Sequence, residues 1–306
     1  MESLKTRLTY IKKKNYLSFK DYIKAEEKLT ACLQKDPNYA PALADIAILQ
    51  IRKFQYREAV LSASKALSID TYHPAANYYY GLANLHLGNT TDAKDGFDIA
   101  AASVEFRSSA YTALSKIYFR ENDLAKAAEY AKKSLGNNQD NLESLQLLAV
   151  LSRLQNNKSR AVEILNTINN VDPLNHFVGF EKYLWDLSEA SKQHFTALIQ
   201  NEMPQQTYLE LGIWYTQLGR KEEALKVLSL ALPNAEIVYW KSYLENKVVD
   251  LSKIQPDNSF PFRGETAAWP RSEQPRSPRA PVLHAAAPGS LQADAHPSRT
   301  PARRIG

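Results

Sequence analysis

The sequence has few of the residues on which most enzyme and metal chemistry depends. Of its 306 residues one is a cysteine, two are methionines and ten are glycines, and the six histidines are isolated from one another. No disulfide can form within the chain, and Cys32 is expected to be a small, buried packing residue. There is no Gly-Lys-Ser or Gly-Lys-Thr phosphate loop, no His-Glu-x-x-His zinc pair and no glycine cluster suited to a dinucleotide turn. We therefore predict that the protein is not an enzyme and has no catalytic, cofactor-binding or metal site.

Long apolar runs are also missing. No stretch approaches the about 18 apolar residues of a membrane span, and Met1 to Thr6 do not begin a signal peptide. We expect a cytoplasmic protein with no membrane partner. If the chain is a piece of a longer protein, a signal upstream of it would overturn this localisation.

Positive charge is concentrated at one end of the sequence. The formal net charge is +5, of which +4 lies in Trp269 to Gly306, where six arginines stand against two acidic residues. The rest of the chain is close to neutral. The basic balance therefore does not predict a nucleic acid as partner.

The same end of the chain differs in composition from the rest. Its last 38 residues hold seven prolines, seven alanines and six arginines, with no lysine, tyrosine or asparagine and no apolar periodicity. Such a segment buries too little apolar surface to offset its ordering entropy, so residues 263–306 are predicted to be a disordered tail. The abrupt change after Gly264 to Ala268 suggests the hypothesis of a shifted reading frame. Translating the coding DNA in its other two frames tests this, and finding no further helical repeats would count against it.

What the sequence does contain is a period of 34 residues. Alanine recurs at this interval at Ala25, Ala59, Ala93, Ala127 and Ala161. The two Asp-Pro pairs, which begin at Asp36 and Asp172, are four intervals apart. A fixed period of this length is typical of a helical repeat array.

Blocks of 34 residues show the same order of small and large side chains. The four full blocks start at Ala40, Pro74, Ser108 and Leu142, and their eighth places hold Ala47, Gly81, Ser115 and Ala149. Twelve residues later comes the alanine of the series. Small residues let two helix backbones approach closely, so each block is predicted to form a helical hairpin. Larger residues at places four, seven and eleven would fill the seam, and places 24 and 27 would face the next hairpin.

Together these features resemble the tetratricopeptide repeat, in four consecutive units that are in phase. Gly88 stands in the turn inside a repeat, and Pro37 and Pro173 stand at place 32, as in that family. The resemblance implies an all-α fold, a right-handed α-α superhelix of about seven hairpins. The departures are Thr71, Glu105 and Gln139 in place of the terminal proline, and Asn77 and Asn84 in places that are usually apolar.

The pattern extends beyond the four full blocks, so the repeat array is predicted to span residues 1–262. Upstream, Ala25 to Pro37 supply the second helix of an earlier unit, whose first helix, around Leu8 to Tyr16, is poorly formed. Downstream, residues 176–204 look like a shortened, degenerate hairpin, residues 205–238 return to the pattern, and residues 239–255 form a partial unit. The period is interrupted between Ala161 and Ala224, which are 63 residues apart instead of 68.

Three strings carry a closer resemblance: Asp70 to Gly81, Asp92 to Phe97 and Phe260 to Arg263. They resemble bacterial proteins in which a β-rich domain of unknown function precedes a long tetratricopeptide array. The similarity would cover roughly Tyr22 to Ala268. It implies that the chain is an internal piece of a longer protein, so that any activity of the β-rich domain lies outside it.

In tetratricopeptide arrays the first helices line a concave groove, and places 2, 5, 9, 12 and 13 face it. The resemblance therefore implies a peptide-binding groove lined by Arg52, Tyr78, His86, Thr112, Lys116, Phe119, Arg120, Gln146 and Arg153. Apolar, aromatic and cationic side chains together suit an extended or helical peptide with apolar anchors and some acidic residues. The alternative is that these cations are solvated surface.

One partner class of the family is not expected. Its chaperone-binding members hold a terminal carboxylate with lysine, asparagine and arginine side chains at defined places. The corresponding residues here are Ala44, Ile48, Tyr79, Ser109 and Ala113. Neither these residues nor those one unit later can hold a carboxylate.

Three functions remain open. The first, which we adopt, is a non-catalytic scaffold that binds a protein or peptide segment in the groove. The second is a structural arm of a larger, carbohydrate-related bacterial protein whose active or binding domain is absent here. The third is a truncated product without a function of its own, which would self-associate through an exposed C-terminal repeat face.

Overall fold

The computed structural model describes residues 22–199 and 204–247, and all regular structure in these ranges is helical. The helices are α2 (Tyr22–Lys35), α3 (Ala40–Arg52), α4 (Tyr56–Ile69), α5 (Pro74–Leu87), α6 (Thr90–Ala100), α7 (Val104–Arg120), α8 (Leu124–Asn137), α9 (Leu142–Leu154), α10 (Lys158–Val171), α11 (His176–Asp186), α12 (Glu189–Leu198), α13 (Pro204–Gln217), α14 (Lys221–Leu228) and α15 (Ala235–Glu245). The all-α prediction is confirmed. The expected helix near Leu8 to Tyr16, the end of the partial unit and the predicted tail lie outside the described residues.

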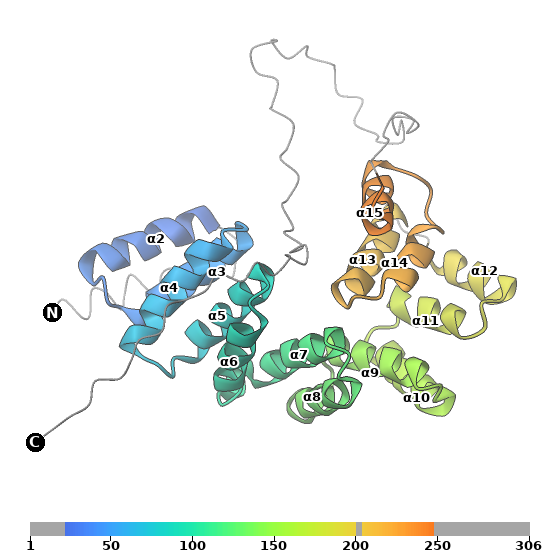
Figure 1. Cartoon of the computed structure of the whole chain (residues 1–306), viewed down its shortest axis with the longest axis horizontal. Helices are drawn as coiled ribbons and strands as arrows, with labels where there is room; N and C mark the ends of the chain where they lie inside the picture. Colours follow the sequence, from blue (N-terminus) through green and yellow to red (C-terminus); the bar gives the residue numbers. More distant parts are fainter. Residues whose placement is uncertain (1–21, 200–203, 248–306) are drawn as a thin grey trace, which may run out of the picture.

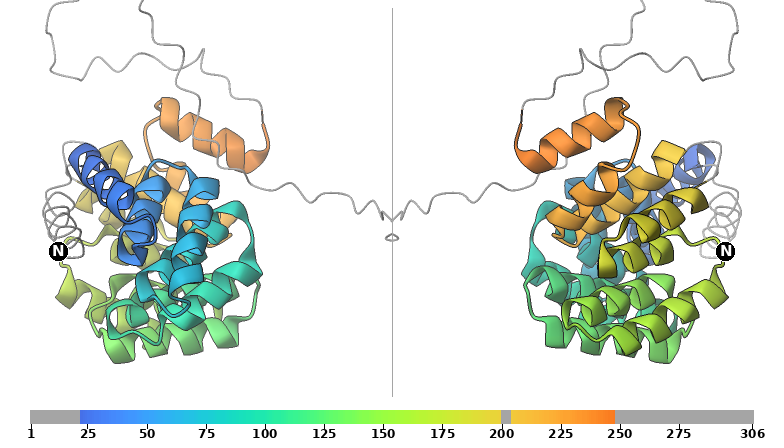
Figure 2. Two further views of the ribbon diagram at one scale, coloured as in Figure 1. Left: turned by 90° about the vertical axis from the view of Figure 1, so that its left-hand side faces the viewer. Right: turned by 90° about the vertical axis from the view of Figure 1, so that its right-hand side faces the viewer.

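The helices pair in chain order into hairpins, from α3 with α4 to α13 with α14. The first helices of neighbouring hairpins also touch, α3 with α5, α5 with α7, α7 with α9 and α9 with α11. Figure 1 shows these hairpins in an arc, with α7 and α9 on its inner side and α8 and α10 on its outer side. The end-on views of Figure 2 show them following a superhelical path. The first helices from α3 to α11 thus form a continuous inner face.

Helix starts agree closely with the 34-residue period. Three first helices, α3, α5 and α9, begin at Ala40, Pro74 and Leu142, the first residues of three blocks. The helix α7 starts earlier, at Val104, four residues before its block. Local sequence explains two of these starts, because proline is favoured in the first turn of α3 and of α5.

Small residues bring the two helices of a hairpin together. At Gly81 in α5 a Cβ atom would lie 2.9 Å from the carbonyl oxygen of Ala93, and at Gly96 in α6 it would lie 2.7 Å from that of Asn77. Both distances are shorter than van der Waals contact, so this approach requires glycine. In the next hairpin the residue at the same place as Gly81 is Ser115. It forms a hydrogen bond across the contact, because its hydroxyl donates to the carbonyl oxygen of Ala127 at 2.7 Å.

In five units the first helix is followed by a residue with positive φ at the same place of the repeat. The residues with positive φ there are Phe54 (60°), Gly88 (84°), Asn122 (63°), Asn156 (54°) and Gly219 (75°). In each full block this is place 15. Glycine adopts the left-handed region freely and asparagine tolerates it, whereas other side chains are strained. In the degenerate unit the equivalent turn comes at Leu187 (φ 52°), three residues early, so α11 is shorter than the other first helices.

The core changes in character along the array. In the first hairpins it is built largely from alanines, and Cys32 is fully buried among them, as predicted. From α9 onward it contains an aromatic cluster of Phe177, Phe180, Phe195 and Tyr215. The two unusual asparagines find backbone acceptors nearby. The amide of Asn77 donates to the carbonyls of Thr71 and His73 just before α5, and that of Asn84 donates to the carbonyl of Tyr80 within α5.

Candidate functional site

The predicted groove residues lie on the first helices, but they differ in accessibility. Arg52, His86 and Arg120 are exposed, and Tyr78, Lys116 and Gln146 are half-buried. We call the accessible surface of α3, α5 and α7 at Arg52, Tyr78, His86, Lys116 and Arg120 the basic groove.

Neighbouring side chains hold most members of the basic groove in place. The guanidinium of Arg52 lies 4.7 Å from the ring centroid of Tyr22 and donates to its hydroxyl. The ring of His86 stacks on Tyr56, with centroids 4.3 Å apart. Lys116 Nζ is 2.5 Å from Glu143 Oε1. Among the described residues Arg120 forms no ion pair or hydrogen bond, so its guanidinium is available to a ligand.

Neighbouring side chains set the protonation states of the aromatic members. They partly desolvate the exposed ring of His86, which lowers its pKa, and the nearby charge of Lys116 lowers it further. Burial raises the pKa of Tyr78, and the carboxylate of Glu143 adds to this. At neutral pH the imidazole is thus neutral and the phenol keeps its proton. The charge of the basic groove comes from lysine and arginine.

Two predicted groove residues are inaccessible, which corrects the prediction. Thr112 is 3% exposed, and its hydroxyl lies 2.9 Å from the Oγ of Ser134 and 2.8 Å from that of Ser144. Phe119 is 4% exposed and belongs to the core. The physical reason is that α8 and α9 pack against α7 and cover these side chains.

Arg153 is the third predicted groove residue that does not face a ligand. It lies in a buried ionic network, with its Nε 2.8 Å from Glu181 Oε2 and its Nη2 3.2 Å from Glu223 Oε1. The hydroxyl of Tyr215 donates to Glu181 at 2.5 Å, and Arg220 pairs with Glu223 at 2.5 Å. Although burial opposes a charge, Glu181 outweighs it and keeps the pKa of Arg153 above its ordinary value.

The network ties four helices together. Arg153 comes from α9, Glu181 from α11, Tyr215 from α13 and Glu223 from α14. Arg153 and Glu223 are 70 residues apart, across the degenerate hairpin. The basic groove therefore ends before the C-terminal end of α9.

Gln146, in contrast, reaches a cavity farther along the inner side. This cavity, of about 290 Å³, lies between α9, the turn before α11, and α13. It is lined by Gln146, Asp172, Leu174, Asn175, His176, Phe177, Thr207, Glu210, Leu211 and Trp214. We call it the acidic pocket, because it contains two carboxylates and none of its lining residues is lysine or arginine.

Comparison with solved structures identifies the architecture. The chain is similar to a tetratricopeptide repeat protein from Parabacteroides merdae (18% identity, TM-score 0.54, covering 79% of this chain and 99% of that one). It is also similar to PilF of Pseudomonas aeruginosa (16%, TM-score 0.55, 80% and 99%) and to PilW, a type IV pilus biogenesis factor (18%, TM-score 0.58, 65% and 94%). The fold is that of a tetratricopeptide repeat array.

At these identities the similarity establishes the tetratricopeptide fold alone. The matches do not support a β-rich domain upstream of the repeats. No family model matches the sequence, and no curated protein matches it.

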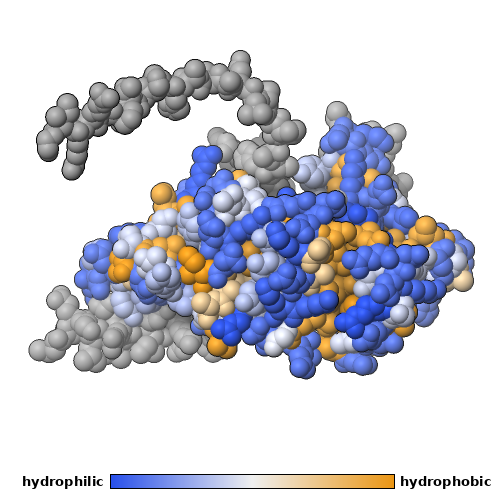
Figure 3. Space-filling model, turned by 60° about the horizontal axis from the view of Figure 1, so that its bottom comes forward, coloured by the Kyte–Doolittle hydropathy of each residue, from blue (hydrophilic) through white to orange (hydrophobic). Residues whose placement is uncertain are grey.

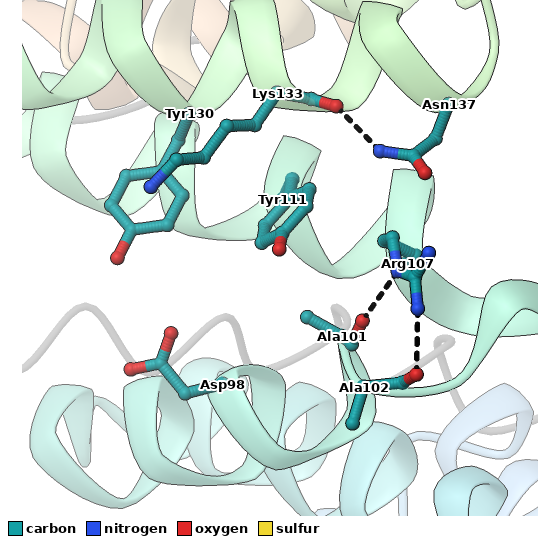
Figure 4. Close-up of a pocket in the computed structure, with 8 residues that line it drawn as sticks. All are labelled: Asp98, Ala101, Ala102, Arg107, Tyr111, Tyr130, Lys133 and Asn137. Carbon is teal, nitrogen blue, oxygen red and sulfur yellow. Dashed lines mark hydrogen bonds between the residues drawn. The ribbon is translucent and has the colours of Figure 1, made fainter.

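A second cavity, of about 550 Å³, lies between α6, α7 and α8 of the tetratricopeptide array. Figure 4 shows Asp98 reaching toward Tyr130 from one wall, while Arg107 donates to the carbonyl oxygens of Ala101 and Ala102 at 2.9 and 2.8 Å. Partial burial raises the pKa of Asp98, and the charge of Asp95 adds to this. Because Arg107 is occupied by the end of α6, this cavity does not offer its guanidinium to a ligand.

Figure 3 turns the lower side of Figure 1 toward the viewer, where apolar areas alternate with hydrophilic ones. Scattered apolar side chains are normal on a soluble surface and do not by themselves mark a binding site. Within the described ranges no three histidine, cysteine or acidic side chains are grouped as metal ligands. No helix in those ranges is long and apolar enough to cross a membrane.

Proposed function

We propose that the protein is a non-catalytic scaffold that binds an extended segment of a partner protein along the inner face of its tetratricopeptide array. The observation that carries the proposal is the basic groove, in which three successive first helices each present an accessible cation or aromatic ring. Extended or helical segments bind such surfaces by placing several side chains against them at once. The partner is a protein, and the proposed location is the cytoplasm.

The chemistry of the basic groove specifies the segment. Arg120 offers a planar guanidinium that can bind a carboxylate with two hydrogen bonds. Lys116 already pairs with Glu143, so it adds less. The neutral His86 ring and the half-buried Tyr78 ring offer apolar contact. The segment should therefore carry an acidic residue beside apolar ones.

The test uses a fluorescein-labelled acidic probe, Ser-Glu-Leu-Ser-Glu-Leu-Ser, and fluorescence polarisation. Arg120→Glu should weaken its binding at least about fivefold, because it replaces attraction by repulsion. The matched control is Arg57→Glu, which changes an exposed arginine on the second helix α4. Equal binding by the two variants would contradict the proposal. Tyr78 is left unchanged because it packs against Phe97 and Phe106.

Self-association through the C-terminal repeat face is a second proposal. The last described helix, α15, covers part of that face by burying Ile237 and Leu244, and it leaves Tyr239 and Tyr243 partly exposed. Sedimentation at increasing concentration should show a dimer that Tyr239→Ser with Tyr243→Ser abolishes. A monomer at every concentration would contradict this. The alternative of a structural arm in a larger protein rests on the sequence resemblance alone, and that of a truncated product rests on the change in composition near the end of the sequence.

A further inference from the structure

The acidic pocket differs in charge from the basic groove, although both lie along the row of first helices. Glu210 is exposed on α13, and its carboxylate accepts a hydrogen bond from the amide of Gln206 at 2.9 Å. Asp172 accepts from the backbone N–H of Leu174 at 3.2 Å and from the side chain of Asn175 at 3.0 Å. All these donors are neutral. Within the described residues neither carboxylate has a lysine or arginine partner, so the pocket presents uncompensated negative charge.

The apolar wall of the acidic pocket is also unusual. Leu174 stands in the turn between α10 and α11 with 83% of its surface exposed, the highest value among the large apolar side chains of the described residues. Leu211 and Trp214 line the same cavity from α13. The aliphatic stem of a lysine or arginine covers this kind of surface while its charged end reaches a carboxylate. An indole ring adds attraction for a cation.

Trp214 supplies an independent indication of a ligand. Its indole Nε1 is sealed from solvent and has no hydrogen-bond acceptor among the described residues. A buried donor without an acceptor is unfavourable, so such groups usually find a partner. Because Trp214 lines the cavity, a segment bound there is one source of the missing acceptor.

We infer that the acidic pocket binds a lysine or arginine side chain of a partner segment, flanked by an apolar residue that packs on Leu174. This inference extends the proposed function. The partner segment would place acidic residues in the basic groove and a basic residue in the acidic pocket, so the array fixes the direction in which the segment binds. Opposite charges at the two ends also disfavour the reversed orientation.

The test uses a second fluorescent probe, Ser-Leu-Arg-Leu-Ser, with the full chain. Glu210→Lys should weaken its binding at least about fivefold, and Leu174→Ser about threefold, since Leu174 is too exposed to matter for folding. The matched control is Glu222→Lys, an exposed carboxylate on α14 outside the pocket. Binding should also weaken with rising salt concentration. Unchanged binding by Glu210→Lys would overturn the inference.

The two probes separate this inference from the proposed function. Arg120→Glu should leave binding of the basic probe unchanged, and Glu210→Lys should not weaken binding of the acidic probe. If only the acidic probe binds, the inference fails and the proposed function stands. If replacing Arg271, Arg276 and Arg279 by serine tightens binding of the basic probe, the chain's own arginines occupy the pocket, and the assignment to a partner is overturned.

Discussion

The hairpins from α3 to α8 and those from α9 to α14 differ in the side chains that fill the interfaces between their helices. The first set keeps the 34-residue period and brings its helices together with alanine, glycine and serine. The second set loses the period after α10, and its last two hairpins contain phenylalanine and tyrosine rings around the buried ionic network. In the last two hairpins Gly179 and Gly212 face leucine side chains of the partner helix, whereas Gly81 and Gly96 in the first set face backbone atoms. Large side chains therefore fill the interface in the last two hairpins.

The two sets also differ in the reach of their interactions. Contacts in the first set join a helix to the next helix or to the next unit. In the second set a single guanidinium, that of Arg153, binds carboxylates from two later units. Removing one member of a buried ionic network is much more costly than removing one member of an exposed pair, because the remaining charges stay buried without compensation. This difference can be measured.

The largest expected effect is that of Glu181→Ala. It leaves Arg153 and the hydroxyl of Tyr215 without their main partner in a site where Glu181 is 1% exposed, and should cost about 3–5 kcal/mol of unfolding free energy. Urea denaturation followed by circular dichroism measures this. The control is Glu143→Ala, which removes a partly exposed partner of Lys116 and should cost under about 1 kcal/mol. Similar losses in both variants would remove the distinction between the two regions.

The next effect belongs to the first region. Gly96→Ala puts a methyl group where a Cβ atom meets backbone atoms of α5, and should cost about 1–3 kcal/mol by forcing α5 and α6 apart. Gly136→Ala is the matched control, because its Cβ atom meets nothing within 4 Å. It should stabilise α8 by about 0.5–1 kcal/mol. Thermal unfolding midpoints that shift in the same direction would contradict the close approach.

Alkaline pH should destabilise the second region through Tyr215. Burial, reinforced by Glu181, raises the pKa of this phenol well above its ordinary value of 10.0. The unfolded chain therefore loses this proton first as pH rises above 10.0, so Tyr215 stabilises the fold fully below that pH and progressively less above it. Above pH 10.0 the contribution of Tyr215 to the free energy of unfolding falls by about 1.4 kcal/mol per pH unit. Tyr215→Phe should flatten this part of the pH dependence, and an unchanged slope would contradict the assignment.

The smallest effect concerns place 15. Phe54 holds a positive φ of 60° while its side chain is mostly exposed, so Phe54→Gly relieves backbone strain without opening a cavity. We expect a stabilisation of about 0.5–1 kcal/mol, since the relief of about 1–2 kcal/mol is partly offset by the entropy of glycine. Gly88→Ala, at the same place one unit later, should destabilise. Equal effects of the two changes on the unfolding midpoint would contradict a common turn.

Much of the first region could be predicted from the sequence, because its contacts are local. The 34-residue interval predicted the first residues of α3 and α5, and also that of α9, where the second region begins; small residues marked the close contacts. The left-handed turn was visible at Gly88, where the residue type reveals it. At Phe54 it was not, since phenylalanine carries no signal for a positive φ.

The candidate site was predictable only in part. The place of a residue in the repeat predicts which face of the first helix it lies on. It does not predict which part of that face a later helix covers. Thr112 and Phe119 were therefore assigned to the groove although α8 and α9 bury them. Glu181 lies in the degenerate hairpin and Glu223 in the unit after it. The interrupted period does not relate the places in these units to those of α9, so the pairing of the two carboxylates with Arg153 had no sequence signal.

Other pairs did carry a signal that was overlooked. Glu26 pairs with Lys53, and Lys94 pairs with Glu121. Both pairs join place 21 of one unit to place 14 of the next, with the charges exchanged. Comparing opposite charges 27 residues apart would have found them.

The 70-residue separation between Arg153 and Glu223 also has a consequence for the order of folding. Contacts between neighbouring units close short loops, so the hairpins from α3 to α8 can form one after another as the chain leaves the ribosome. Arg153 can pair with Glu181 once α11 has been synthesised, but it meets its last partner, Glu223, only after α14 has been synthesised, so the ionic network stays incomplete until then. We therefore expect α9 to become resistant to protease on stalled ribosomes later than α7, in a single step that coincides with the emergence of α14.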